Sequence, residues 1–156
     1  MATMFHEVVE GGAGAGGAGE VRDGGEIAPG TLLAAFEALV SEAVAEAGRE
    51  RVADATGVDG SSVEAAAAGD AGGLSVTDGA AIVAVTADRD AETIVAELRD
   101  HLLMGMATAV LDVDTIAAGI DADLTGQEVQ QALEGRAEMT LAQLAEVMAV
   151  IERRKP

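Results

Sequence analysis

Residues 91–119 read AETIVAELRDHLLMGMATAVLDVDTIAAG, and they hold the longest helical periodicity in the chain. Apolar side chains recur about every four residues here, which is the spacing of one buried helix face. Asp90 precedes the stretch as a candidate N-cap. The run without charge, from Leu102 to Leu111, covers ten residues, and a bilayer crossing needs roughly twenty. The stretch therefore predicts a helix of a protein core or a dimer, and not a membrane span.

Gly105 lies near the middle of this uncharged run, between Met104 and Met106. Glycine inside a helix costs about 1 kcal/mol relative to alanine, so Gly105 predicts the close approach of a second helix. That second helix belongs either to the same chain or to another copy of it. The candidate residues for helix packing or for a dimer are Leu102, Met104, Gly105, Met106 and Val110.

The composition indicates an all-helical protein with a core of small aliphatic side chains. The 156 residues include no cysteine, tryptophan or tyrosine and only two phenylalanines. This length allows one domain or two very small ones, and the lack of cysteine excludes disulfides and thiol chemistry. We predict an all-α bundle of six to eight short helices, in which two similar units pack around the hydrophobic helix of residues 91–119.

The charge balance indicates adaptation to salt. The chain has 28 acidic and nine basic residues, a net charge of −19, and a single lysine, Lys155. Acidic excess with little lysine is typical of proteins from cytosol at molar salt, although an ordinary acidic protein is the alternative. At 1 M salt the Debye length is about 3 Å, so this charge does not exclude nucleic acid as a partner.

Residues 1–30 are predicted to form a disordered, glycine-rich tail. Translation starts at Met1 or at Met4, and the segment lacks the features of a signal peptide. We therefore expect a cytoplasmic protein. A G-x-G-x-x-G pattern occurs at Gly12 to Gly17, but no helix is predicted immediately after it, as a dinucleotide site requires. No cofactor is expected.

Two segments of the remaining chain have the same pattern. The first helical unit covers 31–90 and opens with a helix from Thr31 to about Gly48. The second unit, together with the central helix, covers 91–156. In each unit a short helix ends at a glycine, a second helix ends at another glycine, and a capped amphipathic helix follows. The matching positions are Gly57 and Gly119, Gly69 and Gly135, and the N-caps Ser75 and Thr140; Thr125 and Thr140 also begin capping boxes.

The second unit resembles the helix-turn-helix core of phage-repressor-like DNA-binding domains, most of all in ALEGRAEMTLAQLAEVMAVI. The first unit has a degenerate form of the same pattern. The resemblance implies that the helix in 126–134 enters the major groove and that glutamine amides read base edges. The DNA-contact candidates are Gln127, Gln130, Gln131 and Arg136.

Across 95–150 the chain also resembles a family of uncharacterised proteins from halophilic archaea. The blocks LLMGMATAVLDVDTIA and GQEVQQALEGRAEMTL carry this resemblance. It implies no particular activity.

The titratable residues form no recognisable catalytic or metal site. His101 follows Glu97 by four residues, which we interpret as an ion pair on a helix surface. Two ligands do not make a zinc site, and no H-E-x-x-H motif occurs. The acidic residues 112–123 lack the spacing of a calcium loop. We expect no enzyme, no metal and no identifiable small-molecule substrate.

Two hypotheses for function remain. The first is a DNA-binding or transcription-associated regulator that acts through the second helix-turn-helix-like unit. The second is a non-catalytic interaction or structural module, whose partner is another protein or a second copy of the chain.

Overall fold

The computed structural model describes residues 22–23, 26–121 and 123–155, and its regular structure is almost entirely helical. The predicted tail, residues 1–30, lies mostly outside this described part. Two strands of two residues each, β1 and β2, pair as an antiparallel hairpin ahead of the first helix. The elements are β1 (Arg22–Asp23), β2 (Glu26–Ile27), α2 (Pro29–Ala47), α3 (Arg49–Thr56), α4 (Gly60–Ala67), α5 (Val76–Ala84), α6 (Ala91–Ala109), α7 (Val113–Ala118), α8 (Gly126–Leu133) and α9 (Leu141–Arg154).

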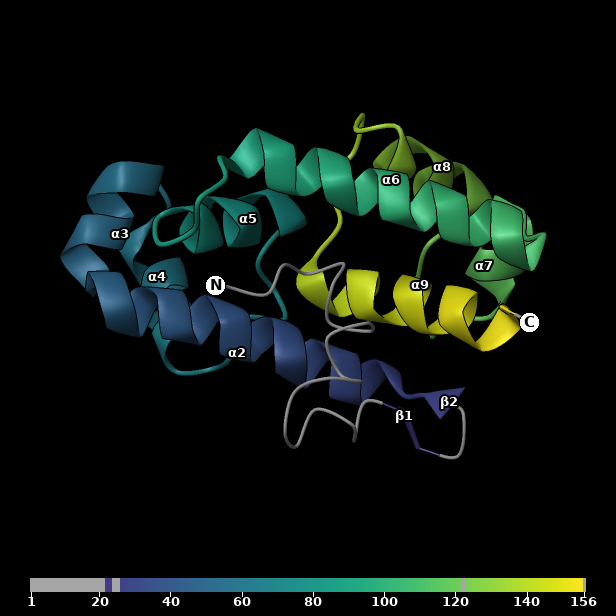
Figure 1. Cartoon of the computed structure of the whole chain (residues 1–156), viewed down its shortest axis with the longest axis horizontal. Coiled ribbons are helices and arrows are strands. Elements are labelled where there is room, and N and C mark those ends of the chain that lie inside the picture. Colours follow the sequence, from purple (N-terminus) through teal and green to yellow (C-terminus); the bar gives the residue numbers. More distant parts are fainter. Residues whose placement is uncertain (1–21, 24–25, 122, 156) are drawn as a thin grey trace.

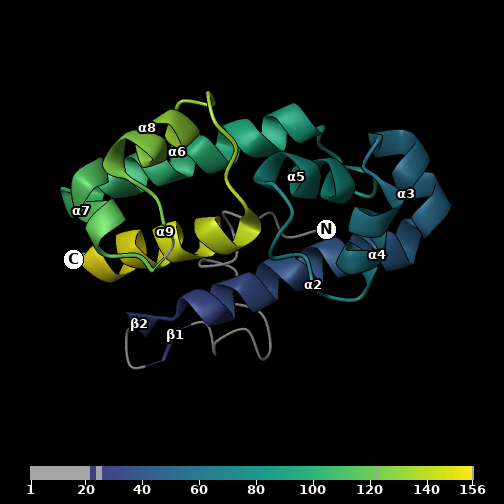
Figure 2. The ribbon, with the colours of Figure 1, turned by 180° about the vertical axis from the view of Figure 1, so that it is seen from behind.

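The predicted all-α bundle is confirmed, with eight helices in the described residues. α2 and α6 run along opposite long edges of the molecule, with α5 and α9 between them (Figure 1). The pair α3 and α4 lies at one end and the pair α7 and α8 at the other, as the view from behind also shows (Figure 2). α2 begins at Pro29 and not at the predicted Thr31, because proline suits the first position of a helix.

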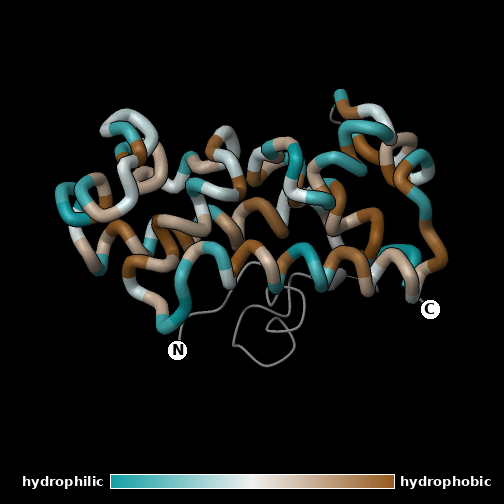
Figure 3. Tube along the Cα trace, turned by 90° about the horizontal axis from the view of Figure 1, so that it is seen from above, coloured by the Kyte–Doolittle hydropathy of each residue, from teal (hydrophilic) through white to brown (hydrophobic). Residues whose placement is uncertain are grey.

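The helix at the centre of the bundle is α9, and the expectation that residues 91–119 would occupy this place is wrong. α9 packs against α2, α5, α6 and α7, and nine of its fourteen residues are buried. α6 has neighbours on one side only and buries a single stripe, namely Ile94, Leu98, Leu102 and Gly105. Apolar segments alternate with hydrophilic ones along most helices (Figure 3). The uncharged run of residues 102–111 therefore did not identify the helix that is most buried.

The two halves of the chain, α2–α5 and α6–α9, have the same order of elements. α2 and α6 have 19 residues each. Each ends at a residue with a positive φ, which is Gly48 in the first half and Val110 in the second. The buried positions also match along the two helices, as Leu32 with Ile94, Phe36 with Leu98, Val40 with Leu102, and Ala43 with Gly105. The repeat therefore extends over four helices.

Each long helix packs on helices of both halves. α2 of the first half packs along α9 of the second, and α6 of the second packs along α5 of the first. The hydrophobic core is one continuous cluster with members from both halves. An approximate two-fold axis thus passes between α5 and α9 and relates one half to the other (Figure 1).

Candidate functional site

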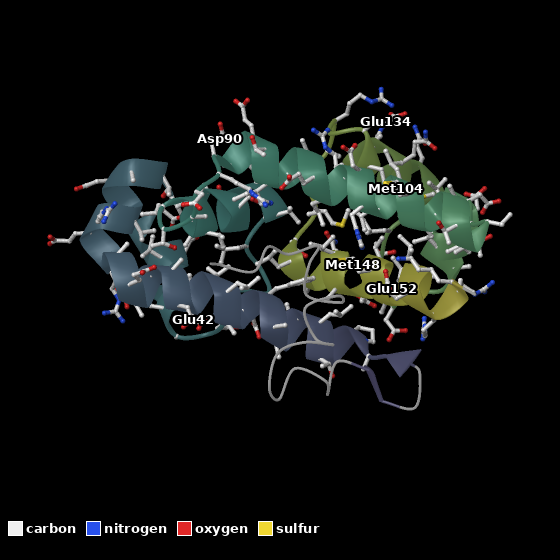
Figure 4. All side chains as sticks on the ribbon, viewed as in Figure 1. Glu42, Asp90, Met104, Glu134, Met148 and Glu152 are labelled. Atoms are coloured by element: carbon white, nitrogen blue, oxygen red, sulfur yellow. The ribbon has the colours of Figure 1, made fainter. Side chains whose placement is uncertain are left out.

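The C-terminal part of α6 exposes a row of uncharged side chains. Leu103 is 48% exposed, Met104 70% and Val110 89%, and these are the large hydrophobic residues most exposed in the described part of the chain. Met104 is labelled in Figure 4. Helical spacing places Leu103, Met104, Ala107 and Thr108 on one side of the helix, Val110 follows as its C-cap, and all five are exposed. We call these five residues the α6 outer face.

Gly105 and Leu102 lie on the opposite side of α6, against α9. A Cβ added at Gly105 would lie 2.7 Å from Cγ2 of Ile151 and 3.4 Å from Cε of Lys155. Leu102 is buried in the core, and Met106 is half-buried beside it. Of the five candidates for packing or a dimer, Gly105 and Leu102 therefore serve the crossing of two helices within the chain. Met104 and Val110 face outward.

The DNA-contact candidates lie on α8 and in the loop that follows it. Gln127 is exposed in the first turn of α8, and Gln131 is half-buried. Thr125 and Glu128 cap this turn with the predicted capping box. The side chains of Gln127 and Gln131 are thus presented by a well-formed but short helix.

Glu134 holds the other two DNA-contact candidates. Nε2 of Gln130 donates a hydrogen bond to Oε2 of Glu134 at 3.0 Å, and Nε of Arg136 donates to Oε1 at 2.9 Å. These hydrogen bonds, that of Gln130 first, lower the pKa of Glu134. Glu134 stands at the edge of the molecule beside α8 (Figure 4). The surface that would meet DNA therefore has a carboxylate at its centre. The spacing of four residues between Gln130 and Glu134 on one helix makes their contact predictable from the sequence.

A cluster of titratable side chains connects α6 to α9, and it differs from the predicted pair of His101 and Glu97. Glu97 pairs with Arg89 at 2.5 Å. Nε2 of His101 lies 3.7 Å from Oε2 of Glu152, and Nζ of Lys155 lies 2.6 Å from the same oxygen. The Glu152 side chain is only 3% exposed, and it sits where α6 and α9 face each other (Figure 4). The predicted ion pair of His101 and Glu97 on the helix surface is thus wrong, because α9 supplies the partner of His101 and the loop before α6 supplies that of Glu97.

Burial alone would raise the pKa of Glu152. The nearby His101 imidazole and the hydrogen bond from Lys155 outweigh the burial, and the pKa lies below its usual value. Glu152 is therefore held as a carboxylate inside the bundle, where it joins α6 to the C-terminal end of α9.

The described residues hold no group of three or more His, Asp or Glu side chains placed to bind one metal ion. Nor is any described helix both long and apolar enough to cross a bilayer.

Comparison with known protein families gives one result. The model of a family of unknown function, DUF5791, matches residues 32–154. The chain belongs to the DUF5791 family. No curated protein and no solved structure matches it. The region shared with DUF5791 runs from the first turn of α2 to the last residue of α9, so it includes both halves and the α6 outer face.

Proposed function

We propose that this protein is a non-catalytic interaction module that pairs with a second copy of itself through the α6 outer face. The observation that carries the proposal is the exposure of Leu103, Met104 and Val110 along one side of α6 and its C-cap, in the uncharged run between the exposed Asp100 and Asp112. Exposed apolar area costs roughly 25 cal/mol per Å², and a row of large apolar side chains on one surface is typical of an interaction site.

The charge of the chain supports a second copy as the partner. Two molecules of net charge −19 repel each other, and they approach at least cost where no carboxylate lies between them. No charged residue occurs from Leu102 to Leu111. A two-fold axis across the α6 outer face would pack the same residues of both copies against one another, as in most homodimers.

The composition supports the further proposal that the protein works in concentrated salt. With 28 acidic residues and one lysine, the repulsion between copies is strong at low ionic strength. It is largely screened when the Debye length falls to a few ångströms. Pairing should therefore strengthen as KCl is raised, because the apolar contribution persists while the repulsion declines.

Sedimentation velocity of the full chain tests this proposal at about 0.2 M and about 3 M KCl, which bracket weak and strong screening. We expect a monomer at low salt and a dimer at high salt. Met104→Lys should leave a monomer at both concentrations. Ala38→Lys adds the same charge at an exposed position of α2, and it should dimerise like the wild type. A wild-type monomer at high salt, or a Met104→Lys dimer of unchanged affinity, would refute the proposal.

Contact with DNA through α8 is the second candidate, and the exposed Gln127 in the capped first turn of α8 favours it. If α8 reads bases, Glu134 is an internal competitor for Gln130 and Arg136. Glu134→Gln should then strengthen duplex binding, and Gln127→Ala should weaken it at selected sequences only. Crosslinked occupancy of the tagged protein across the genome supplies the readout, and a profile without discrete peaks would end this candidate.

A further inference from the structure

A hollow opens between α5, α6, α9 and the loop that follows α8. Its volume is about 130 Å³. The inner wall is apolar and includes Leu98, Leu102 and Leu144, while Arg99, Thr77 and Glu138 supply polar groups. A second, shallower hollow adjoins it and shares Thr77, Val95 and Arg99. The α6 outer face faces away from this place, so the hollow is separate from the proposed dimer surface.

The guanidinium of Arg99 lies over the loop that follows α8. A Cβ added at Gly135 would collide with Nη1 of Arg99. Arg99 is half-buried, and no hydrogen bond or ion pair joins it to any other residue that the structure describes. Arg99 lines the open hollow, so its guanidinium can pair with a carboxylate that enters from solvent.

In the first half of the chain, the position equivalent to Arg99 holds a carboxylate. Arg99 corresponds to Glu37, because the buried stripe of α6 matches that of α2 residue for residue. Oε2 of Glu37 accepts a hydrogen bond at 3.2 Å from the backbone N–H of Ala71. Ala71 is in the loop after α4, which is the counterpart of the loop after α8. A carboxylate of the protein itself therefore closes this loop in the first half.

The two loops begin with the same local geometry, although the loop after α8 is one residue shorter. Gly69 and Gly135 have φ angles of 81° and 78°. In each loop the following residue donates a hydrogen bond to the helix before it, from Asp70 to Ala65 at 2.9 Å and from Arg136 to Gln131 at 2.8 Å. Counted from these glycines, Ala137 is the counterpart of Ala71; it lines the hollow and is exposed, whereas Ala71 is buried. Within the described residues nothing accepts a hydrogen bond from the N–H of Ala137.

We propose that the hollow binds a small organic carboxylate, whose carboxylate group takes the place that the Glu37 carboxylate takes in the first half. The bound group accepts a hydrogen bond from the N–H of Ala137 and pairs with Arg99, whose planar fork suits a carboxylate. The apolar body of the ligand lies against Leu98, Leu102 and Leu144.

The volume of the hollow sets the size of the group that it can enclose. A cavity of about 150 Å³ accommodates a benzene ring, so the hollow encloses a body of roughly six carbon atoms, and a larger ligand would extend into the adjoining hollow of about 440 Å³. Glu138 lies at its rim, where its Oε2 accepts a hydrogen bond from Oγ1 of Thr77 at 3.1 Å. This carboxylate opposes a second negative charge, and it therefore favours ligands with one carboxylate over those with two.

Titration of the full ¹⁵N-labelled chain with benzoate and with benzamide, its uncharged analogue of the same shape, tests the site. We expect saturable shifts of the Ala137 amide and of the Arg99 Nε signal with benzoate. Benzamide should bind at least about tenfold more weakly, because the charge-assisted hydrogen bonds are lost. Equal binding of the two probes, or benzoate shifts confined to other residues, would overturn the proposal without any variant.

Variants test the individual groups. Arg99→Gln should weaken benzoate binding about tenfold or more, while Arg49→Gln, a matched change at an exposed arginine of α3, should leave it unchanged. Glu138→Gln should strengthen binding, since it removes the opposing charge. Unchanged affinity in a folded Arg99→Gln variant, or weaker binding in Glu138→Gln, would contradict the arrangement. If Arg99→Gln does not fold, Arg99→Lys with the two probes decides the same question.

Discussion

Ser75 and Thr140 lie directly opposite each other in an antiparallel bridge between the two halves of the chain. Two backbone hydrogen bonds flank the pair, from Val76 to the carbonyl of Met139 at 2.7 Å and from Leu141 to that of Leu74 at 2.9 Å. Ser75 caps α5 and Thr140 caps α9. Equivalent residues thus meet at the approximate two-fold axis, and the last helix of each half starts beside the start of the other.

Removal of either cap should destabilise both halves, because the bridge couples the two helix starts. Ser75→Ala and Thr140→Ala should each lower the free energy of unfolding by about 1 kcal/mol, the usual value of an N-cap. Thr108→Ala, at an exposed position within α6, is the control and should change it by less than about 0.5 kcal/mol. Urea denaturation measures all three. A Thr140→Ala variant as stable as the control would show that the cap contributes nothing.

Gly105→Ala should destabilise the protein by forcing α6 away from α9. The added Cβ would meet Ile151 at 2.7 Å, and overpacking in a core typically costs about 1–3 kcal/mol. Ala38 is exposed in the interior of α2, so Ala38→Gly serves as the reverse change in exposed helix, with a cost of about 1 kcal/mol from propensity alone. Thermal unfolding in concentrated KCl measures both variants. A Gly105→Ala protein with a raised melting temperature would mean that α9 yields easily.

Val110→Gly should stabilise the protein. Val110 has φ 56° and ψ 53°, a left-handed conformation that costs an L-residue about 1–2 kcal/mol and a β-branched one still more. The side chain is 89% exposed, so little burial is lost. Because glycine also loses more backbone entropy on folding, we expect a net gain of about 1 kcal/mol in denaturant unfolding. Val95→Gly, in the regular part of α6, should instead destabilise.

The buried Glu152 should make the free energy of unfolding depend on pH in the acidic range. Its pKa in the folded protein lies below the usual value of 4.5, so its contribution is complete above pH 4.5 and is lost as the pH falls through the lowered value. Glu152→Gln should cost about 1–3 kcal/mol near neutral pH, because Lys155 loses its partner. The difference from the wild type should shrink below pH 4. Glu42→Gln, on the exposed side of α2, is the control and should give a small difference that does not vary in this way.

Local chemistry made much of the fold predictable from the sequence. The N-caps at Asp90, Thr125 and Thr140 are where their spacing placed them, because a cap depends only on residues within one turn. The repeat was visible for the same reason, since glycines and caps mark the ends of each helix.

The remaining features depend on pairs that are distant in the sequence. The partner of His101 on α9 and the enclosure of α9 by four helices follow from how the halves pack. Helical periodicity records that a face is apolar, but not what covers it. The hydrogen bond from the Ala71 amide to Glu37 spans 34 positions, and neither residue belongs to a motif from which it could be predicted. The contrast between Glu37 and Arg99 became informative only when the structure showed that they are equivalent.

The packing of α2 and α6 across the halves has a consequence for how the chain unfolds. α2 lies along α9 and α6 lies along α5, so the loss of either half would expose apolar surface of the other. We therefore expect the two halves to unfold in one transition. They share this fate although equivalent positions hold opposite charges, as Glu37 and Arg99 do.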